Sequence, residues 1–166
     1  SANQGLNYLT TGKSPSRMGN AHPNLVPYQV FEASDGHLII ATGNDGQYRK
    51  LCALLGLADL ADDPRFLSNA DRIANRAALT DLLTAKTSQR TKTDLLAACE
   101  ASGVPAGPIN DMAEVFADPQ VVARGMQVTV DGLPGVRTPI SFSDAELAIG
   151  RASPKLGQDQ DLISEG

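Results

Sequence analysis

The residues of this sequence that could do chemistry are two histidines, two cysteines and one glycine-rich turn. His22 and His37 are too few and too badly spaced for a metal cluster, so the sequence predicts no metal site. His37 opens an apolar segment and is expected to be structural. His22 lies in the polar run 17–24, which is either a plain loop that leads into a strand or part of a binding site.

The two cysteines, Cys52 and Cys99, fall on the apolar faces of predicted helices. We expect buried free thiols rather than a disulfide, because free cysteine is among the most buried residue types. Neither has a neighbouring base in the sequence that would activate a thiol nucleophile. Reduced thiols fit a cytoplasmic protein best.

The glycine-rich turn is Gly43-Asn44-Asp45-Gly46, directly before a predicted helix. Free N–H groups at a helix N-terminus attract anions, which makes a phosphate loop one interpretation. The turn lacks the Walker lysine spacing and the dinucleotide glycine pattern, and the carboxylate of Asp45 opposes an anion. An ordinary helix start is favoured, with Asn44 as the N-cap and Gln47 in the capping-box position.

A strand, a turn, a second strand and a helix surround this turn. Residues 28–32 alternate apolar and polar types, as in a half-buried strand, and Gly36 permits a tight turn after them. Residues 37–41 are almost wholly apolar, which predicts a strand covered on both faces. Apolar residues at helical spacing follow, and Gly56 is placed to end that helix.

The middle of the chain predicts further helices. Asp63-Pro64 has the form of a helix start, with Asp as N-cap and Pro at the first position. Residues 69–87 contain no Gly or Pro and predict one long helix, with its basic residues in water. Three arginines of this region could form a phosphate patch, but a solvated helix face is favoured. They are Arg65, Arg72 and Arg76.

The next helix is expected to start after Thr91 and to stop at Gly103. The segment 104–109 contains two prolines three residues apart, so it must be extended or turning.

Two short helices and a hairpin follow. Asp111 opens a capping box, and Asp118-Pro119 starts another short helix. Residues 126–130 alternate as a strand. Pro134-Gly135 is expected to form a turn, and 136–140 is expected to pair back on that strand.

These elements predict an α+β fold with a small, largely antiparallel sheet, built from the first hairpin and the late strands and packed with several helices. Residues 1–27 lack sustained periodicity and predict a linker. Residues 28–142 form the predicted domain, and 143–166 predict an exit linker.

Lys and Arg number 14 and Asp and Glu 19, a net charge of −5 without charged runs. This argues against a nucleic-acid surface, where a basic patch is expected. This net charge is compatible with binding of an anionic cofactor such as CoA, which needs only local positive groups. No apolar run approaches membrane-spanning length, so no membrane partner is expected.

Short segments along nearly the whole chain resemble the class III CoA-transferases, the group that contains formyl-CoA and carnitine CoA-transferases. In order, they are Gly19-Asn20-Ala21-His22-Pro23, Pro27-Tyr28-Gln29-Val30-Phe31, Ser34-Asp35-Gly36, Gly43-Asn44-Asp45-Gly46-Gln47, Gly103-Val104-Pro105-Ala106-Gly107-Pro108, Asp118-Pro119-Gln120 with Arg124-Gly125, Pro139-Ile140-Ser141-Phe142-Ser143 and Pro154-Lys155-Leu156-Gly157.

The resemblance covers the small domain of that family and its two linkers. It implies an enzyme that moves CoA between carboxylic acids through mixed-anhydride and aspartyl-CoA thioester intermediates. The nucleophilic aspartate would lie on a large domain outside this chain, so none of the catalytic residues is expected here. The implied substrates are an acyl-CoA and a carboxylic acid, with no covalently bound cofactor, in an interlinked homodimer.

The resemblance also implies an active-site lid at residues 17–27. The residues matched to it are Gly19, Asn20, Ala21, His22, Pro23 and Asn24. Formyl-CoA transferase has a run of glycines where this chain has residues 21–25. The difference argues against formyl transfer and favours a larger acyl substrate such as a dicarboxylate.

Two alternatives stay open. Related racemases share the fold and tend to carry a glutamate where this chain has Asp45, which makes Asn44 and Asp45 secondary site candidates. A transferase is favoured because that glutamate is absent. The other alternative is a binding or dimerisation module without catalysis, which describes the isolated chain well.

Overall fold

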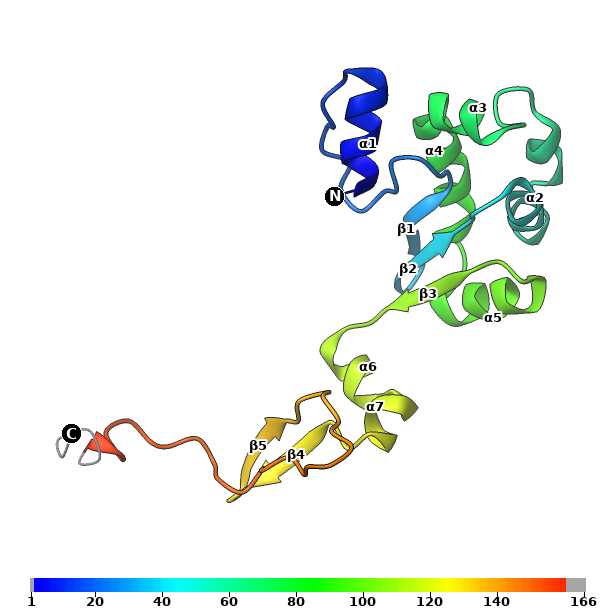
Figure 1. Ribbon diagram of the computed structural model, residues 1–166. Helices are drawn as coiled ribbons and strands as arrows, with labels where there is room; N and C mark the ends of the chain where they lie inside the picture. Colours follow the sequence, from blue (N-terminus) through cyan, green and yellow to red (C-terminus); the bar gives the residue numbers. More distant parts are fainter. Residues whose placement is uncertain (1, 161–166) are drawn as a thin grey trace. The chain divides into compact units, whose positions relative to one another are not determined.

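The computed structural model describes residues 2–160 and confirms the α+β class, with helices and two small antiparallel sheets (Figure 1). The chain divides into two compact units, unit 1 (residues 1–109) and unit 2 (residues 110–166). This division falls inside the predicted domain 28–142. Whether those residues behave as one folding unit stays a prediction.

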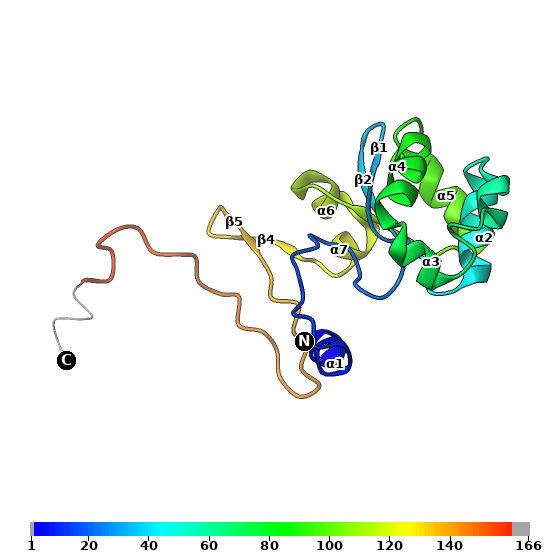
Figure 2. The ribbon, with the colours of Figure 1, turned by 90° about the horizontal axis from the view of Figure 1, so that it is seen from above.

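Unit 1 contains most of the regular structure. Its elements are α1 (Ala2–Thr11), β1 (Tyr28–Ala33), β2 (Gly36–Ala41), α2 (Asp45–Leu54), the 3-10 helix η1 (Ala58–Asp62), α3 (Asn69–Ala74), α4 (Arg76–Thr87), α5 (Lys92–Ser102) and β3 (Ala106–Ile109). The sheet has the order β1-β2-β3 with both pairs antiparallel. Helices α2, α4 and α5 lie on one side of the β1–β2 hairpin (Figure 2).

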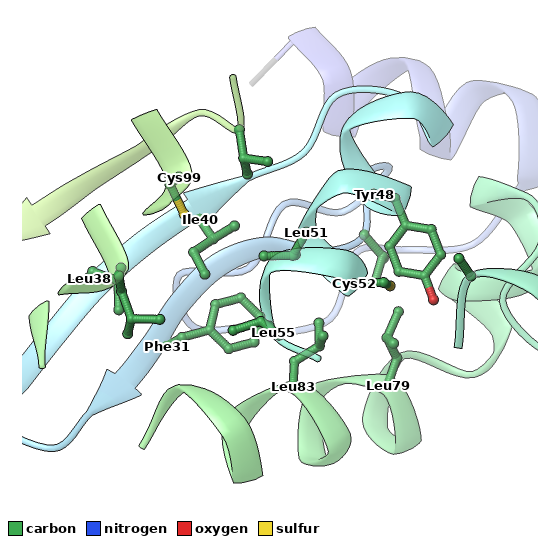
Figure 3. Packing of buried hydrophobic residues seen from close by; sticks show 14 of the residues in the cluster. Phe31, Leu38, Ile40, Tyr48, Leu51, Cys52, Leu55, Leu79, Leu83 and Cys99 are labelled. Carbon is green, nitrogen blue, oxygen red and sulfur yellow. The ribbon is translucent and has the colours of Figure 1, made fainter. Parts of the chain in front are cut away.

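The core lies between the sheet and these helices. Phe31 of β1 points toward Leu55 and Leu83 (Figure 3), and all three side chains are buried. The prediction that both faces of the second strand are covered is wrong for this chain. Leu38 is fully buried, whereas its neighbour Ile39 is only half buried. Helices cover one face of a three-stranded sheet here, so alternate residues stay partly open.

Four predicted helix starts and one predicted stop are confirmed. Side chains of Asn44, Thr91, Asp111 and Asp118 each accept a backbone N–H at the start of their helices. Gly103 ends α5 with φ 66°, a left-handed conformation that Gly adopts without steric strain. These signals act within a few residues, so the sequence specifies them directly.

The middle helices differ from the prediction. Asp63-Pro64 does not start a helix; Ser68 does, in a capping box with Asp71. The predicted helix 69–87 is two helices, because it breaks at Asn75 (φ −110°, ψ 25°). The Asn75 side chain donates to the backbone oxygens of Arg65 and Asp71, which stabilises the break.

The segment 1–27 includes one helix that the sequence did not predict. α1 spans Ala2–Thr11 and buries none of its residues. Its Leu6 and Leu9 are 62% and 79% exposed, so burial within this chain does not explain why the helix forms.

Unit 2 contains α6 (Met112–Ala117), α7 (Pro119–Ala123), β4 (Gln127–Val130) and β5 (Leu133–Val136). The late strands form a sheet of their own and do not join the first hairpin, which corrects the prediction of one sheet. Pro134-Gly135 lies within β5, and the pairing strand is 133–136 instead of 136–140. No residue from 110 to 160 is buried. Part of the predicted exit linker, 161–166, lies outside the described residues.

Candidate functional site

Residues 20–27, here called the His22 loop, contain most of the predicted lid residues and lead into β1. Gly19 has φ 61° and forms a turn in which the Ala21 N–H donates to the Met18 oxygen over 3.2 Å. The Asn20 side chain accepts the Val30 N–H at 3.0 Å, which fastens the start of the loop to β1. The loop is therefore attached to the sheet at its first residues.

The His22 ring is oriented by its neighbours. Its Nδ1 accepts the Asn24 N–H at 3.1 Å, and its ring stacks on Tyr28 with centroids 5.0 Å apart. Because Nδ1 is an acceptor, the neutral ring carries its proton on Nε2. His22 is half buried, and in this tautomer Nε2–H is the donor of the ring.

Three side chains from α3 and the start of α4 hold the His22 loop. Asn69 and Arg72, three residues apart, lie on the same side of α3, and Arg76 is the first residue of α4, after the break at Asn75. The Asn69 side chain donates to the Asn24 oxygen at 2.8 Å and accepts the Val26 N–H at 3.1 Å. The backbone of the loop is thus paired with side chains from far along the chain, as buried polar backbone must be.

Arg76 holds the first half of the loop. Its Nη2 donates to the oxygens of His22 and Pro23 at 2.9 and 3.1 Å. Its Nη1 is buried, and within residues 2–160 it has no hydrogen-bond partner. Burial lowers the pKa of Arg76, since desolvation disfavours the charged form.

Arg72 is buried, which corrects the prediction that this arginine lies in water. It is 1% exposed, and its guanidinium group lies 4.4 Å from the centroid of the Tyr48 ring. Nε donates to the Val26 oxygen at 2.8 Å, and Nη2 contacts Asp45 at 2.6 Å. Neither a phosphate patch nor a solvated face describes this residue.

The secondary candidates Asn44 and Asp45 form the start of α2. Asn44 Oδ1 accepts the Gln47 N–H at 2.9 Å, and Gln47 reaches back to the N–H of Gly43 at 2.7 Å. Through Arg72, Asp45 is connected to the His22 loop, so the structure brings the two groups of predicted site residues into one network. The sequence analysis missed Asn69, Arg72 and Arg76 as members of this network, and their spacing of three and four residues was the available signal.

The remaining candidates do not join this network. His37 is exposed and lies opposite Glu32 in the β1–β2 pair. Cys52 and Cys99 are buried free cysteines, and burial raises the pKa of both thiols, which opposes thiolate formation. Among residues 2–160, no group of His, Cys, Asp and Glu could hold a metal ion, and no helix is long and apolar enough to cross a membrane.

One apolar hollow of about 300 Å³ lies in unit 2, lined by Phe116, Gln127, Pro134, Gly135 and Val136. No charged side chain lines it. It therefore offers no group that would pair with a phosphate or a carboxylate.

The sequence profile of CoA-transferase family III matches residues 1–160. The chain belongs to this family. A succinate–glutarate CoA-transferase of Agrobacterium fabrum (strain C58) is 50% identical over 164 residues, which are 96% of this chain and 41% of that protein. A human succinyl-CoA:glutarate CoA-transferase is 36% identical over 159 residues, 92% of this chain and 36% of that protein.

A solved structure shows the same fold. The crystal structure of a CAIB/BAIF family protein from Brucella suis has a TM-score of 0.86 and 58% identity, over 99% of this chain and 43% of that one. This family III chain spans about two fifths of the length of these curated relatives.

Proposed function

We propose that this chain is the small domain of an enzyme that moves CoA between two carboxylic acids, at least one of them a dicarboxylate. Family III membership supports the reaction class, and the names of both relatives quoted above contain succinate or succinyl and glutarate. Residues 21–25, which replace a glycine run, agree with a substrate larger than formate.

The proposed chemistry uses an aspartate outside this chain. Its carboxylate attacks the acyl-CoA carbonyl, which forms a mixed anhydride and releases the CoA thiolate. The thiolate then attacks the aspartyl carbonyl, so that an aspartyl-CoA thioester forms and the first acid leaves. The acceptor carboxylate repeats the two steps in reverse. Both intermediates react with water, so the site must be covered while the acids exchange.

The His22 loop is the proposed cover, and its attachment is the observation that carries the proposal. Hydrogen bonds from β1, α3 and α4 hold residues 20–26, and the Asn24 N–H orients the ring of His22. A loop held in this way forms a fixed wall for a substrate. We assign His22 to that wall and not to proton transfer.

Asp45 also bears on the racemase alternative. Its carboxylate is paired with Arg72 at 2.6 Å, although its side chain is 60% exposed. Its Oδ1 accepts from the buried Arg72 guanidinium group, which gives the carboxylate a structural partner within unit 1. This contact favours a structural role for Asp45, and with it the transferase over the racemase.

We also propose that the full-length protein is an interlinked homodimer in the cytoplasm. Unit 2 and α1 expose apolar side chains such as Leu9, Val122 and Val136, which agrees with burial against further parts of an interlinked homodimer. Two free buried thiols agree with a cytoplasmic protein.

The test uses the full-length protein with succinyl-CoA and glutarate. His22→Ala is expected to raise KM and to increase acyl-CoA hydrolysis relative to transfer, whereas loss of a catalytic donor would lower kcat on the order of a hundredfold. His37→Ala is the matched control, because it removes an exposed histidine from β2. Identical KM and hydrolysis in the two variants would remove the His22 loop from the site.

The isolated chain gives a second test. It should show no CoA transfer, since the proposed nucleophile is absent from it. Turnover by the chain that disappears when one of its own aspartates is replaced would overturn the proposal.

A further inference from the structure

Arg72 joins three segments that are far apart in the sequence. Its Nε donates to Val26 in the His22 loop, 46 residues away. Its Nη1 donates to the oxygens of Phe66 and Leu67 at 3.0 and 3.2 Å. Its Nη2 contacts Asp45 at the start of α2, at 2.6 Å. Movement of this one guanidinium group therefore affects the loop and α2 together.

The two partners of the ion pair differ in their exposure to solvent. The Arg72 side chain is 2% exposed and that of Asp45 is 60% exposed. Asp45 supplies the carboxylate paired with this buried cation, and a buried charge depends strongly on such a partner. Arg76, which holds the other half of the loop, donates to backbone oxygens, and its buried Nη1 has no hydrogen-bond partner among the described residues. The Asp45–Arg72 ion pair therefore fixes the guanidinium group that holds the Val26 end of the loop.

We propose that Asp45 and Arg72 act as a positioning pair, in which Asp45 fixes the guanidinium group and Arg72 fixes the Val26 end of the His22 loop. This inference rests on the proposed function of the loop as a cover. It assigns Asp45 an electrostatic role at a position where a proton carrier was the alternative. A change at Asp45 then alters the loop without contact between Asp45 and substrate.

Hydrogen exchange of the 166-residue chain tests the positioning itself. In Asp45→Ala, the amides of His22, Asn24 and Val26 should exchange about tenfold faster than in the unchanged chain, because the loop opens more often. Asp45→Asn keeps an acceptor oxygen and should lie between the two. Asp62→Ala is the matched control: it removes a carboxylate that also pairs with an arginine, at 2.8 Å, but this arginine is Arg49, which does not hold the loop. Equal exchange of the loop in Asp45→Ala and Asp62→Ala would overturn the inference.

Kinetics of the full-length protein separate this inference from the proposed function. Asp45→Ala should raise the ratio of hydrolysis to transfer severalfold, and Asp45→Asn should recover part of the change. Faster loop exchange with an unchanged ratio would support the positioning pair and overturn the covering role of the loop. Loss of turnover without faster exchange would overturn the positioning pair, because Asp45 would then act in the reaction directly.

Discussion

The guanidinium group of Arg72 is a buried cation that donates to four acceptors. Three are backbone oxygens and the fourth is the carboxylate of Asp45, and the residue is 1% exposed. Arginine suits this place because its planar group has five donors in fixed directions. Its aliphatic stem and the Tyr48 ring, whose centroid is 4.4 Å from the guanidinium carbon, complete the burial.

Replacement of Arg72 should therefore destabilise unit 1. We expect Arg72→Met to lower the free energy of unfolding by about 3 kcal/mol, because the oxygens of Val26, Phe66 and Leu67 lose the guanidinium donors that they accept from. Urea titration followed by circular dichroism measures the change. Arg49→Met is the control: its ion pair with Asp62 is exposed on both sides, and its unfolding midpoint should stay close to that of the unchanged chain. Equal midpoints for the two variants would contradict the assigned role.

At the scale of elements, the start of α3 depends on a charged capping box. Ser68 donates through Oγ to Asp71 at 2.6 Å and through its backbone N–H at 3.0 Å. These hydrogen bonds lower the pKa of Asp71. A carboxyl group with a lowered pKa in the folded state stabilises the protein above its unfolded pKa, about 3.9, and this contribution disappears as the pH falls through the folded pKa.

The corresponding prediction concerns acid stability. Asp71→Asn should be less stable than the unchanged chain at pH 7, and the difference should shrink as the pH falls below about 4. Thermal unfolding at several pH values measures it. Asp81, exposed in α4, provides the control Asp81→Asn. A stability difference for Asp71→Asn that is constant from pH 7 to pH 3 would contradict this linkage.

The end of α5 gives another element-scale prediction. Gly103 has φ 66°, and a Cβ there would meet only Lys50 Nζ at 3.6 Å, so the backbone and not crowding decides the effect. Gly103→Ala should lower the free energy of unfolding by about 1–2 kcal/mol, and Gly103→Asn by less, because Asn tolerates this conformation.

Gly107→Ala is the matched control for this series. It adds a methyl group to β3 at an ordinary 3.6 Å contact with Ile39 and without a positive φ. Urea titration should place its midpoint near that of the unchanged chain. Indistinguishable midpoints for Gly103→Ala and Gly107→Ala would show that the backbone at Gly103 is not under this constraint.

At the scale of the whole molecule, the two units differ in how much they bury. Every residue of the hydrophobic core lies between Val26 and Val104. In unit 2, no residue from 110 to 160 is buried, and large apolar side chains such as Met112 and Phe142 are 74% and 57% exposed. Ordering a chain needs burial to offset its loss of conformational entropy.

A dissection experiment follows from this difference. Residues 1–109 should unfold cooperatively when expressed alone, whereas 110–166 alone should give the narrow amide dispersion of an unfolded chain in NMR spectra. Limited proteolysis of the whole chain should then cut near residue 110. Protection of the continuous segment 28–142, as the sequence predicted, would show that the late hairpin is stabilised by the first unit after all.

The sequence by itself determined the features that depend on close neighbours. The N-caps Asn44, Thr91 and Asp111, the stop at Gly103 and the first hairpin all follow from residues a few positions apart. In the candidate site, the sequence placed His22 and Asp45 but not the groups that connect them. Each of these signals acts through local backbone geometry, which the order of residues specifies.

Only the tertiary structure decided how the His22 loop is held. Arg72 reaches Val26 across 46 positions, and Arg76 reaches His22 across 54. Polar periodicity reports which residues share a helix face, but it is the same for a face in water and for a face that pairs with another segment's backbone. Burial of a charged side chain depends on which acceptors the fold brings to it. Three of the four acceptors of Arg72 are backbone oxygens, which have no signature in the sequence.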